Sequence, residues 1–178
     1  MTKGMMKSVL FLILFLVCVQ TGFAASWFDD PIIYDEPNEK VFDCRNDIFI
    51  EVVEDPVISK NVSNRTAENN FLYLTVRVLY LADEEMAGLD KSSFILSRRT
   101  EDNTEVRYPL NFMVTMLTNR MRGFSKLTGR LYLPSYRTLS LVFDVDTNDK
   151  QNWELVFLPT ERGSSTSYCE INVPLKVR

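Results

Sequence analysis

Carboxylates are the side chains of this sequence best able to do chemistry, because the chain contains no histidine. Without histidine, neither a Ser-His-Asp triad nor a Cys-His pair can form, and most zinc sites lose a usual ligand. A glycosidase needs only two carboxylates, and the chain has 24 Asp and Glu residues. No pair of them is distinguished by its context, so solvated surface positions are the simpler interpretation. We expect no catalytic residues, no cofactor and no enzymatic activity. A carboxylate-dependent hydrolase of a cell-wall polymer is the alternative.

One acidic run resembles a calcium loop in its spacing. Asp144, Asp146 and Asn148 place oxygen atoms at alternate positions, which suits Ca²⁺. An EF-hand loop, however, needs glycine where Asp149 stands and a bidentate glutamate where Leu155 stands. Strand alternation also directs the first two aspartates to solvent. We therefore predict the end of a strand followed by a turn, and no metal site.

A basic cluster interleaved with methionines suggests a contact surface. Arg120, Arg122 and Lys126 lie near Met116 and Met121, and flexible apolar side chains beside cations suit an acidic partner or a membrane surface. The interpretation we favour is an exposed loop whose methionines and Phe124 pack inward. The whole chain has a formal net charge of −4 and shows no basic stripe, so we do not expect a nucleic-acid partner.

Residues 1–25 have the features of a secretory signal peptide. Lys3 and Lys7 precede an apolar run over residues 9–19, and small residues end the segment at Ala25. The apolar run is shorter than the roughly 20 residues that cross a bilayer. We predict a periplasmic or secreted protein with no stable membrane span once the signal is cleaved. A retained signal anchor is the alternative.

An acidic leader occupies residues 26–40. Its charge and prolines are typical of an extended segment, yet it also carries Trp27, Phe28, Ile33 and Tyr34. Apolar anchors between charges suit a segment that orders on another envelope or extracellular protein, so these four residues are candidates for partner binding. The alternative is an N-terminal strand or plug that covers one end of the domain.

Two cysteines, Cys44 and Cys169, remain beyond the signal segment. In an oxidising compartment such a pair is expected to be bridged. A bridge closing a loop of about 125 residues would stabilise the fold by roughly 4–5 kcal/mol on the chain-entropy model. Two buried, unpaired thiols are the alternative.

Alternating apolar and polar residues predict an all-β domain over residues 41–178, an immunoglobulin-like antiparallel sandwich of about 7–9 strands. We expect a polar turn over residues 61–70, a helical turn over 83–90, and either a short helix or a long loop over 112–124. The strands are expected at residues 47–53, 71–81, 93–98, 105–110, 129–133, 138–145, 153–158 and 168–175.

The order of these features resembles the DUF4352-type immunoglobulin-like domain of bacterial exported proteins. The likeness covers about residues 48–160 and rests on the strand at 71–81, the LVFDV strand at 141–145 and the ELVF strand at 154–157. The glycine-containing turn usual before the LVFDV strand is replaced here by residues 134–137. The resemblance implies a sandwich fold, an envelope location and no established activity.

Export, the sandwich pattern and the absence of histidine together favour a non-enzymatic binding or assembly module of the bacterial envelope. Such a module would act through loops or edge strands. Besides the hydrolase, a structural subunit that adds strands to an envelope assembly is an alternative. The sequence does not predict an oligomeric state.

Overall fold

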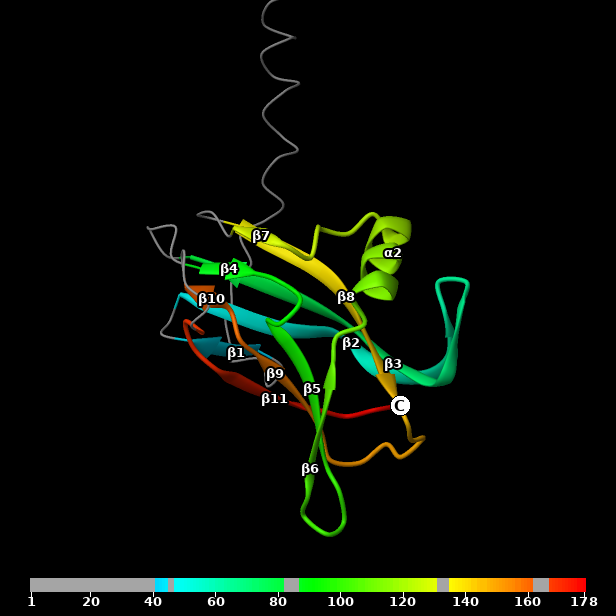
Figure 1. Ribbon diagram of the computed structural model, residues 1–178. Helices are drawn as coiled ribbons and strands as arrows, with labels where there is room; N and C mark the ends of the chain where they lie inside the picture. Colours follow the sequence, from blue (N-terminus) through cyan, green and yellow to red (C-terminus); the bar gives the residue numbers. More distant parts are fainter. Residues whose placement is uncertain (1–40, 45–46, 82–86, 131–134, 162–166) are drawn as a thin grey trace, which may run out of the picture. The chain divides into compact units, whose positions relative to one another are not determined.

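The computed structural model describes residues 41–44, 47–81, 87–130, 135–161 and 167–178 (Figure 1). The strands are β1 (Val41–Cys44), β2 (Ile48–Val62), β3 (Arg65–Tyr80), β4 (Ala87–Leu89), β5 (Phe94–Arg99), β6 (Glu105–Pro109), β7 (Gly129–Arg130), β8 (Ser135–Val145), β9 (Trp153–Phe157), β10 (Thr160–Glu161) and β11 (Ile171–Leu175), and the helix is α2 (Phe112–Arg122). The signal peptide and the acidic leader predicted for residues 1–40 lie outside the described residues.

Two four-stranded antiparallel sheets form the sandwich. One has the order β1-β2-β3-β8, the other has the order β11-β9-β5-β6, and a small third sheet has the order β10-β4-β7. With β2 taken as strand A, the two large sheets have the order A-B-E and G-F-C-C′ that is typical of immunoglobulin domains. The predicted all-β sandwich is confirmed.

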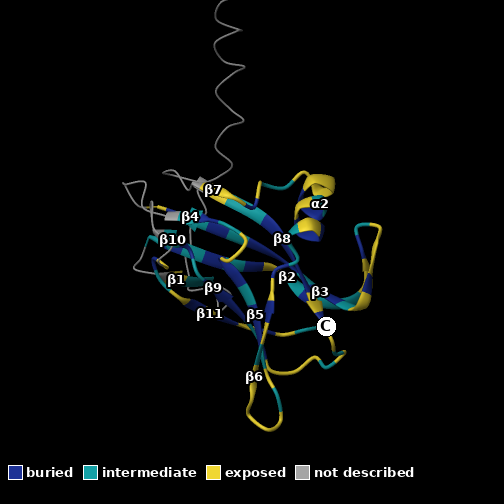
Figure 2. Cartoon of the chain, in the orientation of Figure 1, coloured by how far each residue is buried: buried dark blue, intermediate teal, exposed yellow. Residues whose placement is uncertain are grey.

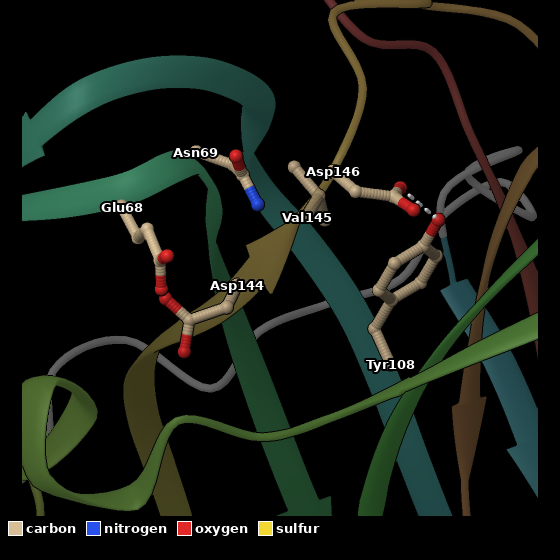
Figure 3. Close-up of a pocket in the computed structure, with 6 residues that line it drawn as sticks. All are labelled: Glu68, Asn69, Tyr108, Asp144, Val145 and Asp146. Carbon is tan, nitrogen blue, oxygen red and sulfur yellow. Dashed lines mark hydrogen bonds between the residues drawn. The ribbon is translucent and has the colours of Figure 1, made fainter.

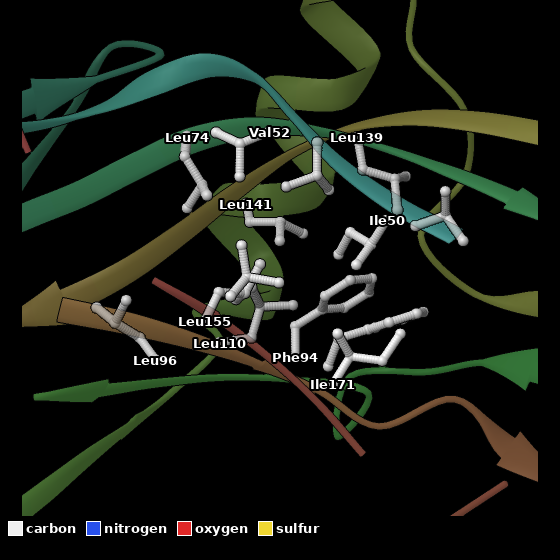
Figure 4. Packing of buried hydrophobic residues seen from close by; sticks show 14 of the residues in the cluster. Ile50, Val52, Leu74, Phe94, Leu96, Leu110, Leu139, Leu141, Leu155 and Ile171 are labelled. Atoms are coloured by element: carbon white, nitrogen blue, oxygen red, sulfur yellow. The ribbon is translucent and has the colours of Figure 1, made fainter. Parts of the chain in front are cut away.

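The core lies between the inner faces of the two large sheets. On β8, Leu139, Leu141 and Phe143 belong to this core, as the alternation predicted for residues 138–145 requires, while Ser140 and Val142 of the opposite face are fully buried as well. Each large apolar side chain contributes about 1.5–3 kcal/mol when it leaves water. Figure 4 labels core residues from both sheets together with Leu110, namely Ile50, Val52, Leu74, Phe94, Leu96, Leu139, Leu141, Leu155 and Ile171.

The β2–β3 hairpin is much longer than the sequence predicted. Of residues 61–70, for which a polar turn was predicted, only two form the turn, and the others belong to β2 and β3, whose pairing continues to Val62 opposite Arg65. The turn itself consists of Ser63 and Asn64, whose φ angles are 48° and 60°. Positive φ at both central residues makes a type I′ turn, which matches the twist of a hairpin. Three register shifts interrupt the pairing of the two strands, and such bulges bend a hairpin.

The expectation of a helical turn at residues 83–90 is wrong for its described part. Ala87–Leu89 forms strand β4, which pairs with both β10 and β7. Leu89 is 3% exposed, so burial of this side chain favours the strand over a solvated turn. Residues 82–86 lie outside the described part of the chain.

For residues 112–124 the sequence predicted either a short helix or a long loop. The structure has helix α2 over Phe112–Arg122. No helix among the described residues is long and apolar enough to span a membrane.

Candidate binding face

Helix α2 begins and ends at residues suited to capping. The Asn111 side chain accepts a hydrogen bond from the backbone N–H of Val114 at 3.0 Å, as an N-cap residue does. At the other end Gly123 has a φ of 68°, the left-handed conformation that ends many helices. The backbone N–H of Phe124 then donates to the carbonyl of Asn119 at 2.8 Å. These caps fix where the helix starts and stops.

The helix turns polar side chains toward the outer edge of β8. The Asn119 side chain donates to the Ser140 carbonyl at 2.9 Å and accepts the Ser140 N–H at 2.7 Å. The Thr115 hydroxyl accepts the N–H of Val142 at 3.0 Å, and the backbone N–H of Asn111 donates to the Val142 carbonyl at 2.8 Å. These groups replace a neighbouring strand, so an edge that is otherwise open to pairing is covered.

The outer side of the helix is exposed as a result (Figure 2), and several of its residues are apolar. Met113, Met116 and Met121 are 76%, 49% and 57% exposed, and Leu117 is half-buried beside them. Spacings of three, four and eight residues place these side chains on one side of a helix. We call Met113, Met116, Leu117 and Met121 the methionine face. The expectation that the methionines of this region pack inward is wrong, because Thr115, Thr118 and Asn119 occupy the buried side.

The tip of the β2–β3 hairpin is fastened to the helix. The hydroxyls of Ser63 and Thr118 are 2.8 Å apart and share a hydrogen bond. A second, small apolar cluster lies beside this bond and joins the hairpin, the helix and β8; its buried members are Val62, Ala67, Phe71, Val114 and Val142. The hairpin tip and α2 therefore form one continuous surface.

A groove of about 400 Å³ runs between these two elements. It is lined by Arg65, Asn111, Met113, Val114 and Leu117. Two residues of the methionine face, Met113 and Leu117, thus form part of a concave site with a cation at its border. Methionine and leucine walls bind apolar groups without demanding one shape.

Arg122, a predicted contact residue, is used inside the domain. Its guanidinium makes two bonds to the Glu54 carboxylate, at 2.6 and 2.9 Å. It also donates to the hydroxyls of Thr75 at 2.9 Å and Ser140 at 3.0 Å, and it lies over the Phe124 ring at 4.5 Å from the centroid. This clamp joins the end of α2 to three neighbouring strands.

The strand register explains the clamp. Glu54 pairs with Thr75 and Thr75 pairs with Ser140, so the three side chains form a row across β2, β3 and β8. Hydrogen bonds from Arg122 and from Thr75 hold the pKa of Glu54 below its usual value. The carboxylate is therefore ionised and paired near neutral pH.

The other two predicted cations are differently placed. Arg120 and Lys126 are exposed, and among the described residues neither forms an ion pair. The segment over 111–130 contains no aspartate or glutamate. The methionine face thus has free positive charge beside it, on a chain that is acidic overall.

The acidic run that resembles a calcium loop lines a second pocket, of about 390 Å³ (Figure 3). Asp146 accepts a hydrogen bond from the Tyr108 hydroxyl at 2.7 Å, and Asp144 accepts one from the Asn111 amide at 2.7 Å. Burial, with the bond and charge of Asp146, raises the pKa of Tyr108 to about 12. The pocket is lined by Glu68, Asn69, Tyr108, Asp144, Val145 and Asp146.

Asp149, the last acid of that run, pairs with Arg98 on β5. The backbone N–H of Gln151 and the guanidinium of Arg98 lower the pKa of Asp149. Arg98 in turn lies over the Trp153 ring at 5.6 Å. Strand β8 ends at Val145, as predicted. No group of three or more potential metal ligands is found within the described ranges.

The predicted disulfide involves one fully described residue. Cys169 is disulfide-bonded, whereas the side chain of Cys44 lies outside the described part of the structure, so the pairing of the two stays a prediction. The four candidate leader residues, Trp27, Phe28, Ile33 and Tyr34, lie outside the described residues as well.

The sequence suggested a contact surface near Met116 and Met121, but it did not predict the methionine face as one side of a helix, although a signal was present. Asn111, Thr115 and Asn119 recur at intervals of four, and Met113, Leu117 and Met121 recur at the same interval two positions later. This is an amphipathic helix, but amphipathicity alone predicts that the polar stripe faces water. Only the open edge of β8 reverses that orientation.

Comparison with known proteins identifies similar folds and no family. No family model and no curated protein match the chain. The crystal structure of YjhA from Bacillus subtilis is 15% identical, with a TM-score of 0.49 over 78% of this chain and 96% of that chain. YcdA from Bacillus subtilis subsp. subtilis strain 168, a candidate lipoprotein, is 13% identical, with a TM-score of 0.51 over 78% of this chain. This chain covers 39% of YcdA. The likeness to YcdA shows a shared fold.

Proposed function

We propose that this chain is a non-enzymatic, exported binding module of the bacterial envelope that contacts a partner protein through its methionine face. The observation that carries the proposal is the orientation of α2, which buries Thr115 and Asn119 and exposes Met113 and Met121. Burying a methionine stabilises by about 1.5–3 kcal/mol. Soluble domains rarely leave several such side chains exposed together unless a partner covers them.

Two observations support the exported setting of this proposal. Residues 1–25 have the charge and hydropathy order of a signal peptide. The fold is also shared with YcdA, which is described as a candidate lipoprotein, and the strand pattern resembles DUF4352-type exported domains. We propose that this chain is related to that family.

The edges of the sheets favour docking on a face over addition of a strand. In the two large sheets of the described residues, the edge of β8 is covered by α2, and the other edge strands, β1, β6 and β11, are four or five residues long. Pro109 ends β6 and Pro174 lies within β11. Short strands and prolines both limit edge pairing. A structural subunit that adds strands is therefore the less supported alternative.

The acidic pocket, lined by Glu68, Asp144 and Asp146, is a candidate site for the hydrolase alternative. Two of its three carboxylates, Asp144 and Asp146, accept hydrogen bonds from Asn111 and Tyr108. A tyrosine whose pKa is raised to about 12 stays protonated near neutral pH and does not act as a base. These bonds support a structural role for the pocket, and we propose that the chain has no hydrolytic activity.

Site-specific photo-crosslinking tests the binding function. A photoreactive amino acid replaces Met113 in the exported chain and, as a matched control, Arg99, which is exposed on the β5–β6 hairpin. We expect a discrete crosslinked protein from position 113 and none from position 99. Adding Met116→Glu and Met121→Glu to the chain should abolish the crosslink from position 113. Equal crosslinking from both positions, or crosslinking that survives the double substitution, would show that another surface binds.

A further inference from the structure

We propose that the partner presents an acidic peptide segment with large apolar side chains, which enter the groove between α2 and the hairpin tip. The inference rests on the proposed function and adds the chemistry of the partner. It is carried by the charge around the groove, by the shape of the groove and by the kind of apolar side chains that line it.

The cation that lines the groove forms no ion pair among the described residues, and the carboxylate bonded to the groove residue Asn111 is that of Asp144. Arg65 lines the groove, and Arg120 and Lys126 are exposed on α2 and on the segment that follows it. Among the described residues none of the three pairs with a carboxylate, whereas Arg122 is neutralised by Glu54. Complementary charge guides a partner to such a surface and selects against partners of the wrong sign.

The shape of the site suits side chains that enter one at a time. The groove of about 400 Å³ has walls from two elements, with Met113 and Leu117 on the helix and Arg65 on the hairpin. An amphipathic segment lays its apolar residues into such a groove and keeps its charged residues at the rim. Methionine walls adapt to several apolar shapes.

A peptide fits this surface better than an anionic bilayer does. Helices that lie in a membrane interface present a strongly apolar face, often with tryptophan or phenylalanine. The exposed side of α2 has methionines but no aromatic residue, and the helix has 11 residues. The adjoining hairpin tip carries polar Asn64 and Thr66, both exposed. This surface offers little for insertion among lipid tails.

Fluorescence anisotropy with synthetic peptides tests the inference on the full exported chain. The probe is a fluorescein-labelled peptide with tryptophan and leucine at helical spacing between glutamates. Two further peptides carry glutamine or lysine in place of glutamate. We expect the acidic peptide to bind about tenfold more tightly than the glutamine peptide, and more weakly as salt is raised, because the contacts are at an exposed rim. The lysine peptide should show the weakest binding.

Charge-reversed variants locate the effect. Arg65→Glu/Arg120→Glu should weaken binding of the acidic peptide by about tenfold or more. Lys91→Glu/Lys176→Glu changes the net charge equally at exposed sites on other elements and should leave binding within about twofold. Equal weakening by both pairs would show a general charge effect and overturn the inference.

Other outcomes separate this inference from the proposed function. Equal binding of all three peptides would overturn the acidic partner and leave the methionine face as a docking surface. The inference is also overturned if phosphatidylglycerol vesicles bind and the peptides do not, or if the chain forms a dimer that Met121→Glu dissociates. If no peptide binds while crosslinking at position 113 is intact, the inference is rejected and the proposed function stands.

Discussion

At the scale of single residues, Asn119 makes the hydrogen bonds to β8 that a neighbouring strand would otherwise make. Its side-chain amide has one donor and one acceptor aimed at the same backbone unit, so it satisfies both Ser140 groups that point out of the sheet. A buried backbone group left without a partner costs about 1–3 kcal/mol. The orientation of the whole helix depends on this amide and on the Thr115 hydroxyl.

Asn119→Leu should therefore destabilise the domain strongly. The leucine matches the asparagine in size but leaves the N–H and carbonyl of Ser140 unpaired under the helix, and we expect the free energy of unfolding to fall by about 2–4 kcal/mol. Urea denaturation measures the change. Asn148→Leu, at an exposed site, is the matched control and should stay within about 0.5 kcal/mol of the parent. Equal effects of the two variants would refute the role of Asn119.

The Glu54–Arg122 clamp predicts a pH dependence of stability. Because the folded-state pKa of Glu54 lies below its usual value, its contribution is fully present above the unfolded-state pKa and is lost as pH falls through the folded-state pKa. The stability difference between the parent and Glu54→Gln should therefore be larger at pH 7 than at pH 3. Glu101→Gln, on an exposed turn, is the control. A difference that grows toward low pH would contradict the clamp.

At the scale of elements, the strands were more predictable than the hairpin and the helix. Alternation on β8 is a local signal, and Leu139, Leu141 and Phe143 face the core as it predicts. Apolar and polar residues alternate only weakly in the part of the β2–β3 hairpin near its tip. There, residues on both faces of the hairpin contact solvent. The capping residues Asn111 and Gly123 mark the helix locally, but its orientation depends on β8, which is distant in sequence.

The hairpin tip offers a test at this scale. Asn64 has a φ of 60°, a conformation that β-branched residues rarely adopt. Asn64→Val should lower the free energy of unfolding by about 1–3 kcal/mol through backbone strain. Asn64→Gly at the same site should leave it nearly unchanged. Thermal unfolding of both variants measures the effect, and a tolerated valine would show that the tight turn is not required.

At the scale of the whole chain, the sandwich was predictable because the core residues recur with a period of two. The proposed docking surface was indicated only in part, because its position depends on which sheet edge lacks a neighbour. The sequence identified Arg120, Arg122 and Lys126 as contact candidates only because these cations are clustered along the chain. Their sequence did not reveal that Arg122 is neutralised within the fold while the other two remain exposed.

The predicted Cys44–Cys169 bridge belongs to the same scale. It would join the segment before β2 to the segment before β11, and its removal should cost roughly 4–5 kcal/mol on the chain-entropy model. Peptide mapping of the exported protein without reductant should find the two cysteines linked. Free thiols at both positions in protein purified under oxidising conditions would contradict the prediction.

The most direct test of the central claim is partner capture by a variant whose methionine face is charged. Met113→Glu/Met116→Glu/Met121→Glu places carboxylates on the outer side of α2 without touching its buried polar side. Leu81→Glu/Tyr136→Glu alters two other exposed apolar residues, which are 45% and 60% exposed. With both variants melting near the parent temperature, the account predicts that the triple variant loses the partner identified by crosslinking and that the control retains it. Undiminished capture by the triple variant would contradict the account.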